Sequence, residues 1–259
     1  MKRLATLLAL LALTAVIAPR AHATSIFADG FSYPNGNLVP NGGWANYSGA
    51  TVDIQVVGGR ATGGAIGNPA NDDHRLFAVQ PTTSKTYACF VVNIPAFVGA
   101  PKPIYFAEFK DAGAANLVSR LYVVSLPTGG ITFGISHSST STTVGLTPWT
   151  APISMGTDYT VVINYDPVNH SSTLWVNPVN EFSPSVTDVN AAIASLAVQG
   201  FGLRQSNAAS ALPAGTFPGT ADWNWVVDNL GVGTTFDDAC ARPTPTQRST
   251  WGQVKSIYR

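Results

Sequence analysis

The sequence contains little charge, little sulfur and few histidines. Only 11% of its 259 residues are Asp, Glu, Lys or Arg, and it has two cysteines and four histidines. No C-x-x-C or H-x-x-x-H spacing occurs, which argues against a transition-metal site. The only long apolar run, residues 4–17, is shorter than the roughly 20 residues that a spanning helix needs. We therefore expect no transmembrane segment in the mature chain.

The N-terminus has the three parts of an export signal. Lys2 and Arg3 precede the apolar run, and Ala21-His22-Ala23 supplies the small residues that signal peptidase accepts. We predict a signal peptide over residues 1–23 and a mature protein that is secreted or held at the cell surface. An N-terminal membrane anchor is the alternative.

Charge is distributed unevenly along the mature chain. Residues 24–241 contain seven basic and fourteen acidic residues, whereas residues 242–259 contain four basic residues and no acidic one. Because nucleic acids are anionic, the acidic body predicts no nucleic-acid partner. The sequence carries no signal for an oligomeric state.

The segment 242–259 differs in composition from the rest of the chain. Its prolines favour an extended, flexible tail, and Trp251, Val254 and Tyr258 then follow the spacing of one face of a short helix. The segment resembles the C-terminal address tags of exported bacterial proteins, and a disordered end is the alternative. The residues that a sorting machine would read are Trp251, Lys255, Tyr258 and Arg259.

The two cysteines, Cys89 and Cys240, both follow the signal peptide. In an exported protein such a pair can form a disulfide, which would tie the C-terminal end of the domain to a strand. Two separate thiols are the alternative, because geometry decides whether a bridge can form.

Short runs rich in Val, Ile, Phe, Tyr and Thr recur between turn signals and predict strands. We expect strands at 54–57, 61–65, 86–94, 104–110, 117–124, 131–136, 159–166, 173–176, 200–205 and 226–232. The turn at 166–169 predicts a hairpin between two of them. Only residues 189–196 suggest a helix. The pattern predicts a single all-β sandwich domain over residues 24–241.

Three stretches resemble the concanavalin A-like lectin/glucanase superfamily, which includes laminin-G-like domains. They are Phe31-Ser32-Tyr33-Pro34-Asn35-Gly36, Ser172-Thr173-Leu174-Trp175-Val176-Asn177-Pro178 and Val226-Val227-Asp228-Asn229-Leu230-Gly231. The resemblance implies a two-sheet antiparallel jelly-roll sandwich whose first and last strands pair. It does not select a function, because this fold serves many functions.

The carboxylates do not form the paired pattern of a glycosidase. Glu108 and Asp111 lie three residues apart, so they should point to opposite faces of a regular strand. We expect Glu108 and Lys110 to be solvent-facing polar residues. His74, His137 and His170 all lie in polar, turn-like stretches without a nucleophile elbow. The sequence therefore predicts no catalytic residues.

The resemblance also implies a structural calcium ion where the first and last strands meet. The matching positions are Asp29, Gly30 and Asp228, and Asp72-Asp73 is a second, weaker group of oxygen ligands. Asp228 lies in an apolar strand and would need a partner when buried. Backbone N–H donors are the alternative to a metal.

Sugar rings stack on exposed aromatic side chains, so tryptophans in turn-rich stretches are candidate ligand-binding residues. The candidates are Trp149, Trp44, Trp223, Tyr47 and Trp225. Trp149 is the best of them for an exposed position, and Trp225 is expected in the core. We expect an exported, non-catalytic module that binds carbohydrate or a cell-envelope component, with calcium as its possible cofactor. A structural or adhesion domain with a protein partner and a glycan hydrolase with an unrecognised site are the alternatives.

Overall fold

The computed structural model describes residues 25–49, 52–64, 71–97, 103–137, 145–205 and 223–241. The predicted signal peptide (1–23) and C-terminal tail (242–259) lie outside these residues and stay predictions. Within the described ranges, no helix is both long and apolar enough to cross a membrane.

Nine strands form one antiparallel sheet. In spatial order they are β14 (Val186–Val189), β13 (Ser171–Val176), β12 (Asp158–Asp166), β7 (Thr86–Phe97), β16 (Trp223–Gly233), β5 (Arg60–Gly64), β4 (Gln55–Val57) and β2 (Gly36–Asn37), and β1 (Ser25–Asp29) also pairs with β16. The first and the last strand are therefore neighbours, as the resemblance implied.

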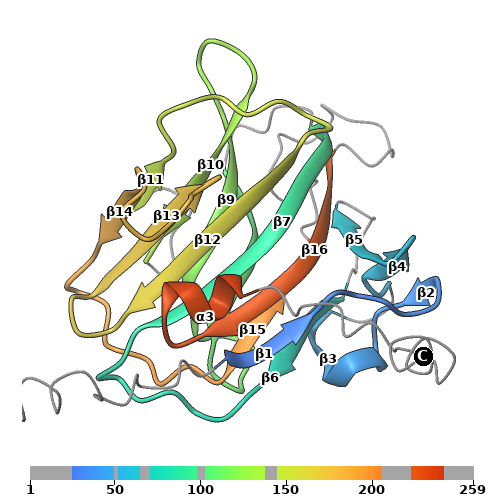
Figure 1. Ribbon diagram of the computed structural model, residues 1–259, viewed down its shortest axis with the longest axis horizontal. Helices are drawn as coiled ribbons and strands as arrows, with labels where there is room; N and C mark the ends of the chain where they lie inside the picture. The colour runs from blue at the N-terminus through green and yellow to red at the C-terminus, as the bar shows by residue number, and fades with distance from the viewer. Residues whose placement is uncertain are drawn as a thin grey trace, which may run out of the picture.

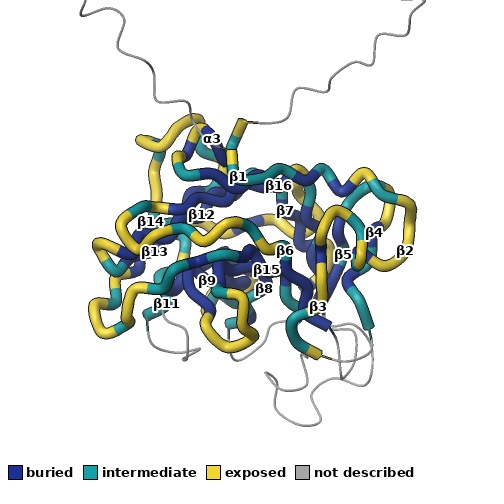
Figure 2. Tube along the Cα trace, turned by 90° about the horizontal axis from the view of Figure 1, so that it is seen from below, coloured by how far each residue is buried: buried dark blue, intermediate teal, exposed yellow. Residues whose placement is uncertain are grey.

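Seven strands form the second antiparallel sheet. Their order is β11 (Leu146–Pro148), β10 (Ile131–Ser136), β9 (Leu117–Ser125), β8 (Ile104–Lys110), β15 (Gly200–Leu203), β6 (Asp72–Leu76) and β3 (Trp44–Ser48), which follows the 3-10 turn η1 (Asn41–Gly43). The two sheets lie face to face as two layers (Figures 1 and 2). This architecture confirms the predicted jelly-roll sandwich.

The apolar side chains of both sheets meet between the layers. Phe106 and Phe109 of β8 are fully buried there, and Phe109 packs edge-on against Phe201 of β15 at 5.6 Å between ring centroids. Register shifts between β8 and β9 on both sides of Ala107 interrupt the regular alternation, so Phe106, Ala107 and Phe109 all belong to the core. Glu108 and Lys110, which alternate with Phe109, lie on the outer face of the seven-stranded sheet.

A short helix covers part of the outer face of the nine-stranded sheet. It is α3 (Phe236–Cys240), whose N-cap, Thr235, accepts a hydrogen bond from the backbone of Asp238. A disulfide joins Cys240 to Cys89 of β7. Of the two alternatives that the sequence allowed for these cysteines, the structure therefore has the disulfide. It fixes the C-terminal end of the described chain to the sheet.

All ten predicted strand ranges contain strands, and the hairpin at 166–169 joins β12 to β13 as predicted.

The helix predicted at 189–196 is wrong. Val189 ends β14, and the Asn190 side chain then accepts the backbone N–H of Ala192 in a turn. The following backbone binds Tyr165, since the N–H of Leu196 donates to its hydroxyl. These contacts replace helical hydrogen bonds.

Candidate functional site

The outer face of the seven-stranded sheet carries polar and aromatic side chains from β3, β6, β8 and β9 and from the residue after β15. We call this set the outer-face cluster: Tyr47, Asp72, His74, Tyr105, Glu108, Lys110, Arg120, Tyr122 and Arg204. It extends from the interior strands β9, β8 and β6 to Tyr47 on β3 at the edge of the sheet.

Two glycines in β15 make room for the cluster. Gly202 lies between His74 of β6 and Glu108 of β8 in the strand register, and a Cβ atom at Gly202 would lie 2.3 Å from Glu108 Oε1. Gly200 lies opposite Lys110, and its Cβ atom would be 3.1 Å from Lys110 Cγ. Glycine at both positions therefore lets the two long side chains lie along the sheet.

Glu108 is 0% exposed, so the prediction of a solvent-facing side chain is wrong. Its Oε1 atom accepts a hydrogen bond from the Tyr47 hydroxyl, and its Oε2 atom has no hydrogen-bond partner. Burial raises the pKa of Glu108, although the Tyr47 hydrogen bond and the nearby cations act in the opposite direction. The cause of the burial is the interior position of β8, between β9 and β15.

Lys110 and His74 form a second buried pair. Lys110 Nζ lies 2.9 Å from His74 Nδ1 and also donates to the carbonyl groups of Asp111 and Gly113. Burial, and then the positive charge of Lys110, lower the pKa of His74 to about 4. The imidazole is therefore neutral near pH 7, and an Nδ1 atom that accepts from Lys110 leaves the ring proton on Nε2.

Tyr47 connects the two pairs. Its ring stacks on His74 at 5.2 Å between centroids, and Lys110 Nζ lies 4.3 Å from the centre of the Tyr47 ring. Its hydroxyl donates to Glu108. A partly exposed tyrosine is thus held on its face by a cation and at its hydroxyl by a carboxylate.

Arginines and tyrosines make up the other half of the cluster. The Tyr105 ring lies 4.3 Å from the guanidinium carbon of Arg204 and 4.8 Å from that of Arg120. Tyr122 lies 5.5 Å from Tyr105 between centroids, and its buried hydroxyl has no hydrogen-bond partner. Burial raises the pKa of Tyr122 to about 12, so this hydroxyl keeps its proton.

Asp72 anchors the end of β15 beside the cluster. It accepts the backbone N–H of Gln205 at 2.9 Å, and its Oδ2 atom lies 3.8 Å from Arg204 Nε. Burial raises the pKa of Asp72 to about 7 even though Arg204 lowers it. The side chain therefore fixes Arg204 in place while carrying only part of a negative charge near neutral pH.

This arrangement offers hydrogen-bond donors, acceptors and aromatic rings on a rigid surface. The partly exposed members are Tyr47, Tyr105 and Arg204, and the buried ones hold them in position. A neutral imidazole and a carboxyl of raised pKa are also groups that can transfer protons. The structure thus places binding chemistry and potential acid–base chemistry on one sheet face.

The tryptophans predicted to bind a ligand lie elsewhere. Trp44 is 2% exposed and its indole N–H donates to Asp29, while Trp223 is 1% exposed and packs against Phe106. Neither buried ring offers a face on which a sugar could stack, because both fill the core. Trp149 is half-buried at the edge of the core and stays a candidate.

The residues predicted to bind calcium do not fit a calcium site. Asp29 accepts hydrogen bonds from Phe31 N, Tyr33 Oη and Trp44 Nε1, and Arg75 lies 3.2 Å away. These groups surround Asp29 with donors and a positive charge, where a cation would need oxygen ligands.

The other two predicted calcium ligands are similarly engaged. The Gly30 carbonyl accepts from Ser32 Oγ, and Asp228 lies 3.8 Å from Arg60 and accepts the Asn229 N–H. In the part of the chain that the structure describes, no three His, Cys, Asp or Glu side chains group to hold a metal.

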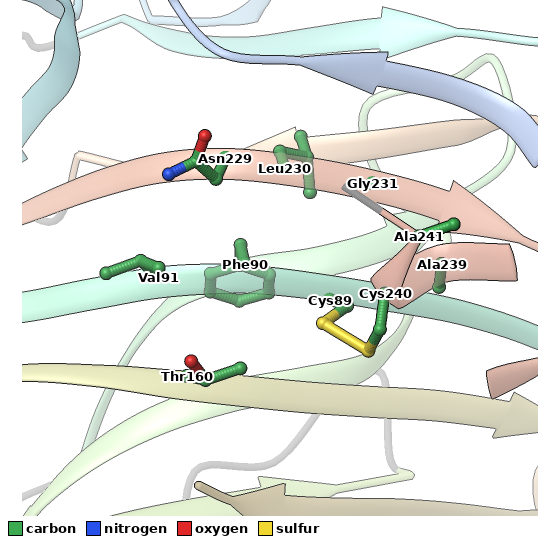
Figure 3. A pocket seen from close by; sticks show the side chains of 10 residues that line it. All are labelled: Cys89, Phe90, Val91, Thr160, Asn229, Leu230, Gly231, Ala239, Cys240 and Ala241. Carbon is green, nitrogen blue, oxygen red and sulfur yellow. A yellow bond between two sulfur atoms is a disulfide. The ribbon is translucent and has the colours of Figure 1, made fainter. Parts of the chain in front are cut away.

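A small pocket lies where α3 meets the nine-stranded sheet. Figure 3 shows it between β7, β16 and the disulfide of Cys89 and Cys240. Its volume is about 20 Å³, which is room for one water molecule. The pocket is therefore too small to be a sugar site.

Sequence reasoning named Tyr47 as a candidate aromatic residue but missed Arg120, Arg204 and the two other tyrosines of the outer-face cluster. It also placed His74 and His137 in turns, whereas His74 lies in β6 and both side chains are buried. One signal was available in the strand Gly200-Phe201-Gly202-Leu203. Two glycines on the same face of a strand indicate that other groups approach closely there.

Comparison with known proteins gives structural similarity only. No protein family and no curated protein matches the sequence. A structure titled "Sialidase" is similar with a TM-score of 0.51 and 14% identity, over 84% of this chain and 19% of that one. The chain thus spans about a fifth of that protein's length.

A second similar structure is the CBM2 module of the Lactobacillus casei BL23 phage J-1 evolved Dit. It has a TM-score of 0.52 and 11% identity, over 83% of this chain and 96% of that one. At such low identity the similarity shows the fold alone. Together with the two antiparallel sheets and the pairing of β1 with β16, it identifies the fold as a two-sheet jelly-roll sandwich.

Proposed function

We propose that this protein is an extracytoplasmic glycan-binding module and that the outer-face cluster binds the glycan. One observation carries the proposal: the partly exposed side chains of Tyr47, Tyr105 and Arg204 lie on one sheet face, and buried neighbours hold them in place. Sugars supply hydroxyl groups that donate and accept, and C–H faces that stack on aromatic rings.

The charge of the cluster favours an acidic glycan. Lys110, Arg120 and Arg204 are three of only seven basic residues in the acidic body of the chain. Their carboxyl neighbours, Glu108 and Asp72, have raised pKa values and so carry less than their full charge. Guanidinium groups bind carboxylates in two-pronged hydrogen bonds, so a sugar that carries a carboxylate suits this face.

The similarity of fold is compatible with this function without selecting it. One of the similar structures is titled a CBM2 module, and another is titled "Sialidase". Because one fold supports many functions, the proposal depends on the cluster and not on the resemblance.

The test is binding of the purified chain to an array of acidic and neutral glycans, followed by titration calorimetry. We expect binding to an acidic glycan that weakens as salt rises. Arg204→Ala should lower the affinity at least tenfold. Arg60→Ala is the matched control, because its side chain is 28% exposed against 25% for Arg204 but lies on the other sheet.

Two results would argue against the proposal. Equal loss in both arginine variants would show that the effect is not local to the cluster. No binding to any glycan, with or without calcium, would favour an adhesion module with a protein partner. Trp149→Ala, measured in parallel, tests the remaining tryptophan.

A second candidate function is cleavage of the bound glycan. The observation that favours it is the neutral His74 beside Tyr47 and the raised pKa of Glu108, since perturbed groups of this kind gather at catalytic sites. Mass spectrometry of a bound glycan after long incubation would decide. Shorter fragments from the native protein and none from His74→Gln would support an enzyme, and an unchanged glycan would support the binding module.

A further inference from the structure

A second polar group lies where the edges of the two sheets meet. Asp53 precedes β4 of the nine-stranded sheet, and Asp73 belongs to β6 of the seven-stranded sheet. The last two strands of each sheet, β4 and β2 on one and β6 and β3 on the other, lie near each other in Figure 1. We call Asp53, Asp73 and Asn71 the edge site.

The side chain of Asn46 bridges the two carboxylates. Its Nδ2 atom lies 2.6 Å from Asp73 Oδ1 and 3.0 Å from Asp53 Oδ1. Both carboxylates are thus within reach of one small atom. Asn71 Nδ2 and Asn37 Nδ2 also donate to Asp53, each at 2.6 Å.

Oxygen atoms at this site lack partners. Asp73 is fully buried and its Oδ2 atom has no hydrogen bond, and Asn71 is 7% exposed with its Oδ1 atom equally unpartnered. The Asn71 amide contacts Asp53 through its nitrogen, so half a turn of the amide would bring its unpartnered oxygen to Asp53. Gln205, whose Nε2 atom donates to the Asn71 carbonyl, leaves its buried Oε1 atom without a partner as well.

No described ion pair neutralises the edge site. Asp29, Asp72, Asp158, Asp166 and Asp228 each have an Arg or Lys within 4 Å, whereas the described ion pairs include neither Asp53 nor Asp73. Two neighbouring carboxylates without a counter-charge repel each other and are costly to bury. Burial, and then the charge of Asp53, raise the pKa of Asp73 to about 7, and a bound cation would favour the charged form of both carboxylates.

We propose that the edge site binds one calcium ion between Asp53 and Asp73. Carboxylate and amide oxygens are the ligands that calcium prefers, and calcium accepts irregular sets of six to eight oxygens that include carbonyl groups and water. Rotation of the Asn71 or Asn46 amide by half a turn would present its oxygen to the ion. The ion would hold together the edges of the two sheets, away from the disulfide.

The proposal is tested on the full chain by titration calorimetry with CaCl₂ after treatment with chelator. Thermal unfolding with calcium and with chelator gives a second readout, and neither depends on glycan binding. We expect one calcium ion per chain, with a dissociation constant of about 10⁻⁵–10⁻³ M, and a melting temperature several degrees higher with calcium. MgCl₂ should bind more weakly, because magnesium requires a regular octahedral site.

Three variants sharpen the test. Asp73→Asn should lower calcium affinity at least tenfold, and Asn71→Asp should raise it by adding a third carboxylate. Asp188→Asn is the matched control, because Asp188 is also buried and without a described ion pair, but its oxygens accept from His137 N and Thr147 Oγ1. It should bind calcium like the native chain.

Three outcomes would overturn the proposal. The first is that calcium gives the native chain neither a heat of binding nor a higher melting temperature. The second is a native calcium affinity in Asp73→Asn, and the third is a lower calcium affinity in Asn71→Asp when its circular dichroism spectrum is native. If Asp73→Asn does not fold, Asp53→Asn and Asn71→Asp still decide the question.

Discussion

Glu108 is buried at the centre of the outer-face cluster, and burial raises its pKa. The folded protein therefore keeps the Glu108 proton at pH values where the unfolded chain has lost it, so the contribution to stability falls as pH rises above the ordinary glutamate pKa. We predict that Glu108→Gln raises the melting temperature at pH 8 by about 2 °C or more. At pH 4 the difference should nearly vanish.

Scanning calorimetry at the two pH values measures this effect. Glu181→Gln is the control, because Glu181 also accepts a tyrosine hydroxyl but lies exposed in a loop. A lower melting temperature of Glu108→Gln at pH 8 would mean that the nearby cations hold Glu108 ionised. A more stable variant that binds glycan less well is the pattern expected of a functional residue.

His137 is a buried histidine outside the cluster. It stacks on Tyr165 at 5.5 Å and its Nδ1 atom lies 3.0 Å from Ser172 Oγ. Burial, and then the charge of His170, lower the pKa of His137 to about 4, although Asp166 opposes the shift. The unfolded chain therefore binds a proton first as pH falls, and stability is lost between about pH 6.5 and pH 4.

We predict that His137→Gln flattens this part of the pH profile. In the native protein, His137 should lower the free energy of unfolding by up to about 3 kcal/mol between pH 7 and pH 4. Urea unfolding at pH 7, 5.5 and 4 would measure this decrease. The pKa of His74 is lowered to the same extent, so part of the pH dependence of stability should remain in His137→Gln. His170→Gln should keep most of the slope, because burial is a larger cause of the His137 shift than the charge of His170. A native slope in His137→Gln would contradict the prediction.

At the scale of elements, the glycines of β15 decide whether the cluster can form. A Cβ atom at position 202 would lie 2.3 Å from Glu108 Oε1, whereas one at position 200 would lie 3.1 Å from its closest neighbours. We predict that Gly202→Ala displaces the Glu108 carboxylate from Tyr47 and lowers glycan affinity severalfold. Gly200→Ala should have a smaller effect.

Calorimetric titration of both variants with one glycan measures the difference. Because a glutamate side chain can move aside, we expect Gly202→Ala to fold with a melting temperature only a few degrees lower. Equal glycan affinity in the two variants would show that Glu108 does not need its present position for binding.

Strand β6 shows why local pattern failed at the site. Its sequence, Asp72-Asp73-His74-Arg75-Leu76, is polar at nearly every position and predicts a turn. The strand is nevertheless paired on both sides, with β15 and β3. Two of its polar side chains have partners from distant parts of the chain, Lys110 for His74 and Arg204 for Asp72. A local pattern does not contain those partners.

At the scale of the whole molecule, the disulfide closes a span of 151 residues between Cys89 and Cys240. Crosslinks of long span stabilise a fold mainly by restricting the unfolded chain. We predict that replacement of both cysteines by alanine lowers the free energy of unfolding by about 3–5 kcal/mol. Urea unfolding measures it, and the native chain under strong reductant should show a similar loss. A loss below about 1 kcal/mol would contradict the prediction.

The two sheets have different roles in the molecule. The nine-stranded sheet contains the pairing of the first and last strands and carries α3 on its outer face. The seven-stranded sheet buries one face in the core and carries the outer-face cluster on the other. The disulfide therefore lies on a different sheet from the surface proposed to bind glycan. For this reason the folded cysteine variants should still bind glycan.

The sequence by itself determined ten of the sixteen described strands, the hairpin at 166–169 and the sandwich class. Those features depend on alternation, β-branched residues and turn residues, which act between near neighbours in the chain. Only the tertiary structure decided which polar residues are buried together. Glu108 and Gly202 are far apart in sequence and meet only because β8 pairs with β15. Trp44 and Trp223 likewise became core residues through packing between sheets, because burial depends on distant neighbours that local sequence does not contain.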